Sequence, residues 1–117
     1  MYKYKESISI LINKFPELRK VYEENIDDYE ELPYVFYESV FVKYILDKVD
    51  CYDETKLKII FIFVEDMLAN GDEDTKNLIG VAIIESLYYE EDLKTKEKLL
   101  RFFGELTKKS FDDCFPK

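Results

Sequence analysis

Two apolar runs joined by an Asn-Gly-Asp turn, between Leu57 and Leu87, constrain the fold of this chain more than any other feature. The first run has the i, i+3, i+4, i+7 and i+11 spacing of one helix face, carried by Leu57, Ile60, Phe61, Val64 and Leu68. Its other apolar residues widen that stripe, so we expect a helix that is packed on two sides. The second run repeats the pattern from Leu78 onward and predicts a second central helix.

The turn between the two runs carries helix-end signals on both sides. Gly71 suits the position just after a helix, where we expect it in the left-handed conformation. Asp72 is a candidate N-cap of the following helix, and the acids Glu73 and Asp74 in its first turn are favoured by the helix dipole. These signals predict a helical hairpin with the bounds 55–70 and 73–89.

The remaining segments also show helical patterns, and only three glycines and three prolines are available for β turns. On the long helix that opens at Pro33, we expect one inner face of Val35, Val42, Ile45 and Val49. We predict an all-α fold, a compact bundle of about six helices in antiparallel hairpins, as a single domain over residues 1–117. The further helices are expected over Tyr4–Lys14, Glu17–Glu24, Pro33–Val49 and Leu93–Lys109, with a short tail, 110–117, for which Phe111 and Phe115 are docking candidates.

The charge and the cysteines limit the partners and the compartment. A net charge of −9 argues against nucleic acid and anionic membranes and favours a basic protein partner. Polar residues interrupt the apolar residues near the N-terminus, whereas a signal peptide has a continuous apolar region. The longest apolar runs of the chain are too short to cross a bilayer. Cys51 and Cys114 fit no metal spacing and favour free thiols. We therefore predict a cytoplasmic protein.

The chain lacks the usual residue patterns of enzymes. It has no histidine, no glycine-rich phosphate loop and no nucleophile elbow around its serines. Residues 70–81 resemble a calcium loop, but Thr75 and Val81 stand where Gly and Glu are required. Glu65 and Glu85 are candidates for a carboxylate pair, although a structural role at the edge of each apolar stripe is the commoner one. We predict no catalytic residue, no metal and no cofactor.

An acidic stretch with interleaved tyrosines is the candidate binding surface. The expected contact residues are Glu23, Glu24, Asp27, Asp28, Tyr29, Glu30 and Glu31, followed by Asp72, Glu73 and Asp74. Tyrosine supplies contact energy at low entropic cost, and carboxylates attract basic groups on a partner. Taken alone, however, these acids also fit a solvated loop and ordinary helix capping.

Two resemblances suggest what such a surface is for. Residues Phe63–Leu87, with Thr75-Lys76 opening the second helix, resemble a HEAT-type repeat and imply stacked helices. Leu32-Pro33-x-Val35-Phe36, the Gly71-Asp72 turn, Asn77-Leu78 and Glu85-x-Leu87 resemble a family of small bacterial helical proteins that includes immunity proteins encoded beside polymorphic toxins.

The second resemblance implies binding and neutralising a cognate toxin domain, with a nuclease as one example. The alternative is a HEAT-like adapter for an unrelated intracellular protein. A third interpretation is a small-molecule sensor that uses the aromatic helix after Pro33, with the residues Tyr34, Phe36, Tyr37, Phe41 and Tyr44.

Overall fold

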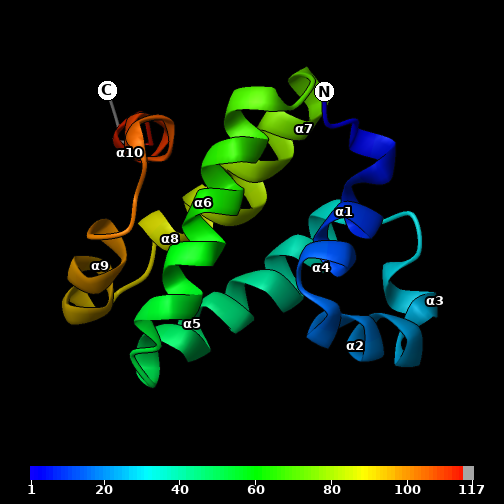
Figure 1. Ribbon diagram of the computed structural model, residues 1–117, viewed down its shortest axis with the longest axis horizontal. Helices are drawn as coiled ribbons and strands as arrows, with labels where there is room; N and C mark the ends of the chain where they lie inside the picture. Colours follow the sequence, from blue (N-terminus) through cyan, green and yellow to red (C-terminus); the bar gives the residue numbers. More distant parts are fainter. Residues whose placement is uncertain (115–117) are drawn as a thin grey trace.

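The computed structural model describes residues 1–114 and confirms the all-α fold (Figure 1). Within these residues β structure is limited to an isolated bridge between Tyr2 and Gly71. The N-terminal elements are η1 (Tyr4–Glu6), α1 (Ser7–Lys14), η2 (Pro16–Leu18), α2 (Arg19–Glu24), α3 (Ile26–Tyr29), α4 (Pro33–Phe36), η3 (Tyr37–Phe41) and α5 (Val42–Asp50). They are followed by α6 (Glu54–Asn70), α7 (Glu73–Leu78), η4 (Ile79–Glu85), α8 (Ser86–Tyr88), α9 (Leu93–Leu100) and α10 (Glu105–Asp112).

Three long helical rods form the centre of the molecule. One rod runs without a break from α4 through η3 to α5, and the predicted hairpin consists of α6 and the continuous rod α7–η4–α8. The hairpin bounds predicted from the sequence are confirmed to within a residue. Both η3 and η4 are π-helical, and they pack against each other in the core. The buried apolar side chains of these rods and of α1 make one continuous cluster.

The π-helical segment η3 explains why one core prediction is wrong. Val42, Ile45 and Val49 are buried as expected, but Val35 is 41% exposed. A π-helical turn holds more residues than an α-helical turn, so η3 moves the inward face one position toward the N-terminus and away from Val35. Phe36 is fully buried for a separate reason, because one tyrosine ring from α2 and one from α3 pack against it.

The packing of α6 also differs from the prediction. Its inner side is buried as expected, but Ile62 in the middle of the helix is 67% exposed and Ile59 is also exposed. The outer side of α6 is therefore open, and the wide apolar stripe does not mean packing on two sides.

Gly71 ends α6 for a different reason from the one predicted. Its φ is −84°, so the expected left-handed conformation is wrong. The constraint is steric, because a Cβ on Gly71 would lie 2.5 Å from the carbonyl oxygen of Met67. The N-terminal segment lies against this turn: the Tyr2 N–H donates to the Asn70 carbonyl at 2.8 Å, and the Asp72 N–H donates to the Tyr2 carbonyl at 2.8 Å.

The expected last helix, Leu93–Lys109, is two helices. The chain leaves the helical conformation between Arg101 and Gly104, and α10 begins at Glu105. Gly104, the residue before α10, makes no side-chain cap, and the carboxylate of Glu65 on α6 takes that role. It accepts from the N–H groups of Leu106 and Thr107, both at 2.9 Å, and from the Thr107 hydroxyl at 2.9 Å. A Cβ on Gly104 would lie 2.4 Å from this carboxylate, so the glycine leaves room for the cap.

The predicted tail begins too early, because residues 110–112 belong to α10. Phe111 is docked as expected, with edge-on ring contacts to Tyr88 at 5.2 Å and to Phe103 at 5.3 Å. Phe115 lies outside the described residues. Together with the split of the last helix, the helical turn α3 explains why the structure has more helices than predicted.

Candidate functional site

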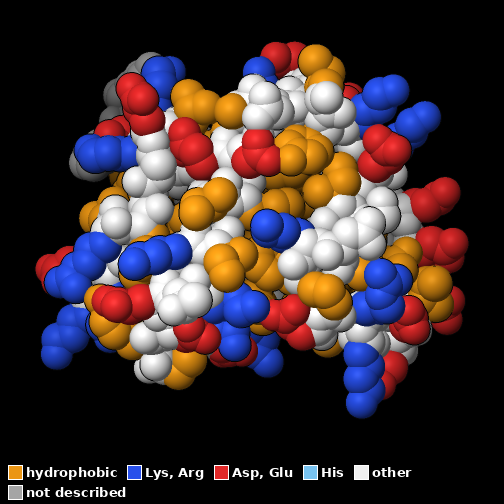
Figure 2. Space-filling model, viewed as in Figure 1, with side chains coloured by type: hydrophobic (Ala, Val, Ile, Leu, Met, Phe, Trp, Pro, Cys, Tyr) orange, Lys and Arg blue, Asp and Glu red, His pale blue; other side chains and the backbone are white. Residues whose placement is uncertain are grey.

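The acidic end of the molecule is formed by residues 22–33, from the last turn of α2 through α3 to the start of α4. Figure 1 shows α2 and α3 on one side of the molecule, away from the hairpin and from α9. On the face drawn in Figure 2, several acidic side chains project along that edge with basic side chains among them, and the opposite edge also carries both signs of charge. The acids predicted from the sequence are thus placed together on an exposed flank.

Two tyrosines hold the acidic end on the core. The rings of Tyr22 and Tyr29 both meet the buried ring of Phe36 edge-on, with centroids 5.3 Å and 5.2 Å away. This edge-to-face geometry is the one that aromatic quadrupoles favour. Glu31 adopts a φ of 59°, and the chain turns there. Two residues later, the buried Pro33 begins α4. The acids are therefore carried on a short segment whose two aromatic anchors are fixed.

The carboxylates of the acidic end have almost no partners inside the molecule. Glu24 faces Lys20 at 3.7 Å in an exposed i, i+4 pair. Among the described residues no ion pair engages the other acids of this segment, which are Glu23, Asp27, Asp28, Glu30 and Glu31. Exposed carboxylates of this kind contribute little to folding and keep their charge available to a partner.

A cavity of about 590 Å³ opens beside these acids, between α1, α2 and the segment before Pro33. Glu23, Glu30 and Glu31 line it together with the rings of Tyr4 and Tyr22. Lys5 and Arg19 also line it, so its wall carries both signs of charge. Sequence reasoning did not find the contributions of α1, because nothing in the local spacing indicates that α1 lies against residues 30–33.

The second predicted set of acids is used mainly by the fold. Asp72 caps α7 by accepting from the Thr75 N–H at 2.8 Å, and it also accepts from the Tyr4 N–H at 3.3 Å. The hydrogen bonds from Thr75 hold the pKa of Asp72 below its ordinary value. Glu73 faces Lys76 at 3.6 Å, while no described residue makes an ion pair with Asp74. Of this set, only Asp74 has a carboxylate that neither caps a helix nor makes an ion pair within the described residues.

Tyr4 connects the two sets. Its backbone is held by Asp72, and its side chain lines the cavity beside Glu30 and Glu31. The pKa of Tyr4 is raised by burial first, and then by the nearby Tyr34 and the negative charge of Asp74. The acids at the start of α7 and the acids of the acidic end therefore lie on either side of Tyr4.

The tyrosines of the long helix have structural contacts. The Tyr37 hydroxyl, fully buried, donates to the Ser7 carbonyl at 2.7 Å, and burial raises the pKa of Tyr37. The Tyr44 hydroxyl donates to the Glu17 carboxylate, and the Tyr34 hydroxyl accepts from the Asn77 amide at 2.6 Å. These contacts explain the aromatic helix without a ligand, and the sensor interpretation stays a prediction.

Of the two carboxylates considered for acid–base chemistry, Glu65 has a structural role. Burial on its own raises the pKa of Glu65, but the hydrogen bonds from Leu106 and Thr107 outweigh it and lower the pKa below the ordinary value. A carboxyl held in its charged form as a helix cap is a structural acceptor. Sequence reasoning missed this cap because Glu65 and Leu106 are 41 positions apart. Among residues 1–114 no group of three metal-ligating side chains is assembled.

Comparison with known proteins places the chain in one family. A family model described as "Domain of unknown function (DUF7674)" matches residues 8–115, and the chain belongs to that family. No curated protein and no solved structure matches the chain. The resemblances to HEAT repeats and to immunity proteins stay predictions. Across residues 1–114 no helix combines the length and the apolar composition needed to cross a membrane.

Proposed function

We propose that this member of the DUF7674 family is a non-enzymatic protein-binding domain that neutralises a basic partner through its acidic end. The observation that carries the proposal is the pairing of five uncommitted carboxylates with two anchored tyrosines. The charges are free to meet a partner, and the rings of Tyr22 and Tyr29 already have fixed positions. Binding then costs little side-chain entropy, which is why tyrosine contributes strongly to interfaces.

The partner class that we favour is a toxin domain, as for an immunity protein, and a nuclease is the example that fits best. A nuclease binds polyanions in a basic groove, and the acidic end would cover such a groove and exclude the nucleic acid. The net charge of −9 would also speed the encounter with a basic partner. The toxin assignment itself rests on the sequence resemblance around Leu32–Phe36 and Gly71–Leu87.

We also propose a cytoplasmic location. Cys51 and Cys114 are both free thiols in the structure, and Cys51 is exposed. A reducing compartment keeps such thiols free.

The test uses two variants with the same change in net charge. In the first, Glu23, Asp27, Asp28 and Glu30 are replaced by Lys, and in the control, Asp47, Asp50, Glu91 and Glu97 are replaced by Lys. All eight side chains are exposed, and none makes an ion pair within the described residues. The candidate partner is the C-terminal domain of the protein encoded next to this gene, and interferometry measures its association with each variant.

We expect the first variant to associate at least 10-fold more slowly than the control, since local charge complementarity and not net charge alone directs docking. We also expect it to lose protection of cells that express the toxin domain. Equal association rates for the two variants would remove the acidic end from the mechanism. If the protein is instead a HEAT-like adapter, the two variants should associate at equal rates. Substituting exposed apolar residues should then abolish binding.

A further inference from the structure

The cavity beside the acidic end combines an apolar lining with charges of both signs. Its volume is about 590 Å³, within the range of roughly 300–1,000 Å³ that is typical of small-molecule sites. The buried residues Ile12 and Pro33 and the half-buried Ile8 contribute the apolar lining. The cavity therefore has the size and the mixed lining of a ligand site.

Two tyrosines in the wall of the cavity are held in place by contacts outside it. The ring of Tyr22 packs edge-on against Phe36, with centroids 5.3 Å apart. The ring of Tyr4 lies 6.0 Å from the ring of Tyr34, and the Tyr4 N–H donates to Asp72 at 3.3 Å. Part of the wall is therefore fixed before a ligand arrives, so that binding orders few side chains.

The charged groups in the wall do not pair with one another. They are three carboxylates and two cations, from Glu23, Glu30, Glu31, Lys5 and Arg19. Within the described residues none of these five makes an ion pair. Arg19 donates to the Asn13 side chain at 3.4 Å, and this neutral amide leaves the charge of the guanidinium in place. The cavity thus offers positions for a cation and for an anion at the same time.

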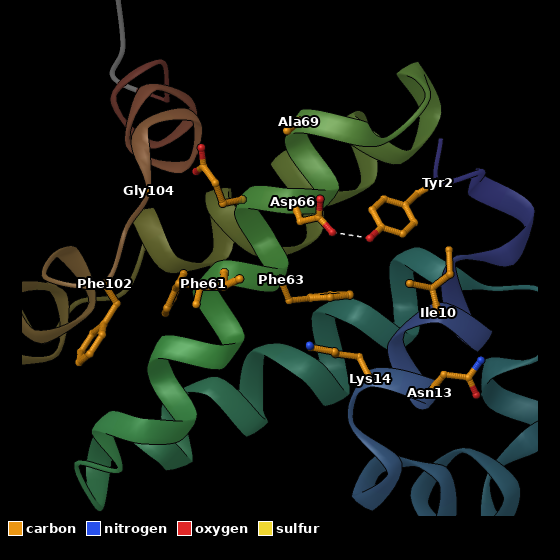
Figure 3. Close-up of a pocket in the computed structure, with 12 residues that line it drawn as sticks. Tyr2, Ile10, Asn13, Lys14, Phe61, Phe63, Asp66, Ala69, Phe102 and Gly104 are labelled. Carbon is orange, nitrogen blue, oxygen red and sulfur yellow. Dashed lines mark hydrogen bonds between the residues drawn. The ribbon is translucent and has the colours of Figure 1, made fainter.

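The larger hollow beside α6, of about 790 Å³, differs in this respect (Figure 3). Its carboxylate Asp66 accepts from the Tyr2 hydroxyl and from the Asn70 amide. Its other carboxylate, Glu65, accepts from the N–H groups at the start of α10. The carboxylates of the acidic-end cavity have no such partners among the described residues, so this cavity is the stronger candidate for a ligand site.

We propose that the acidic-end cavity binds a free cationic amino acid, either arginine or lysine. The wall carries one net negative charge, and such a ligand carries one net positive charge at neutral pH, from two cations and one carboxylate. The ligand carboxylate meets Lys5 and Arg19, and its two cations meet the carboxylates on the other side chains of the wall. Its aliphatic stem packs on the apolar lining, and the tyrosine rings attract a guanidinium.

The two cations of the wall distinguish a free amino acid from an arginine side chain of a protein partner. A side chain brings a cation without a carboxylate, so Lys5 and Arg19 would oppose it, whereas the free amino acid satisfies both signs of charge. The inference therefore goes beyond the proposed neutralisation of a basic protein and does not depend on it. A negative result in the experiment below would leave that proposal standing.

Three small molecules test which charges the cavity recognises. L-Arginine carries all three charges, agmatine lacks the carboxylate, and L-citrulline has a neutral side chain. Isothermal titration calorimetry with the full chain, at constant ionic strength, should show saturable binding of arginine and binding of the other two that is weaker by about 10-fold or more. Absence of saturable arginine binding would overturn the proposal. Agmatine or citrulline binding as tightly as arginine would also overturn it, and equal binding of agmatine would assign the cavity to a cationic side chain of a partner.

Substitutions in the wall connect the binding to this cavity. Glu30→Gln should weaken arginine binding by about 10-fold, whereas Glu91→Gln should leave it unchanged, because Glu91 is an exposed carboxylate outside the cavity. Arg19→Gln should weaken arginine binding by a similar factor without weakening agmatine binding, since agmatine has no carboxylate for the guanidinium to hold. All three side chains are exposed, and circular dichroism checks that the variants are folded. Equal effects of Glu30→Gln and Glu91→Gln, or equal weakening of both ligands by Arg19→Gln, would overturn the proposal.

Discussion

The acidic end and the hairpin half of the molecule use carboxylates in opposite ways. The hairpin half is the part built from α6, the α7–η4–α8 rod and the segments packed on them. In the hairpin half, Glu65 and Asp72 accept hydrogen bonds from α10 and from the N-terminal segment. In the acidic end, the side-chain carboxylates of Glu30 and its neighbours accept no hydrogen bond from the described residues, and Glu24 alone makes an ion pair among them, with Lys20. The other hydrogen bonds of this segment are backbone contacts between nearby residues. An acid-rich composition therefore does not identify a binding surface. What sets the acidic end apart is that its unused carboxylates lie in one short segment together with the anchored rings of Tyr22 and Tyr29.

The comparison predicts that the hairpin half is where substitutions change stability most, and Gly71→Ala should have the largest effect. The new Cβ would meet the Met67 carbonyl oxygen at 2.5 Å and the Thr75 side chain at 2.7 Å, and backbone atoms cannot move aside cheaply. We expect a loss of about 1–3 kcal/mol in the free energy of unfolding, measured in urea.

Gly80→Ala is the matched control for Gly71→Ala. At Gly80 the nearest atom to an added Cβ is the Ser110 oxygen at 3.8 Å, and the residue is helical. Alanine should therefore stabilise the protein by about 0.5–1 kcal/mol. A similar loss at both glycines would contradict the steric role of Gly71.

The next effect tests the comparison directly on two carboxylates. Glu65→Ala should lower the free energy of unfolding by about 1–2 kcal/mol, because the N–H groups at the start of α10 lose their acceptor. Glu30→Ala should leave it within about 0.5 kcal/mol, because no described residue uses that carboxylate. If the two substitutions had equal cost, the distinction between committed and free acids would fail.

The Glu65 cap should also depend on pH. Its pKa in the folded state is below the ordinary value of 4.5, so its contribution is present at neutral pH and is lost as the pH falls below 4.5 through the folded value. The difference in unfolding free energy between wild type and Glu65→Gln should shrink over that range in urea titrations. A difference that stays constant from neutral pH to pH values well below 4.5 would contradict the ionised cap.

The smallest effect is expected at the acidic end. The four-lysine variant of Glu23, Asp27, Asp28 and Glu30 should unfold within about 0.5 kcal/mol of wild type, while its association with a basic partner changes strongly. Thermal unfolding of this variant gives the measurement. A large loss of stability would mean that these acids belong to the fold, as Glu65 does.

The features that were predictable from the sequence are those with local signals. The bounds of α6 and of the α7–η4–α8 rod follow from apolar spacing, and the Asp72 cap follows from its position before the helix. The exposure of the acidic end follows from its composition. These predictions needed only residues within a few positions of one another.

The features that were not predictable depend on distant contacts or on a change of helix geometry. The Glu65 cap joins residues 41 positions apart, and the Tyr2 bridge joins the first residues to the α6–α7 turn. Neither leaves a mark in local periodicity. The exposure of Val35 follows from the extra residue accommodated in η3, which a constant helical spacing cannot represent.

The π-helical geometry of η3 has a consequence for changes in chain length. Removing one residue within Tyr37–Phe41 would return this stretch to an α-helix, with the residues on both sides keeping their inward faces. The same deletion in the middle of α6 would rotate half of that helix by about 100° relative to the core. The long rod after Pro33 should therefore tolerate the loss of a single codon within η3, whereas α6 should not tolerate one in its middle.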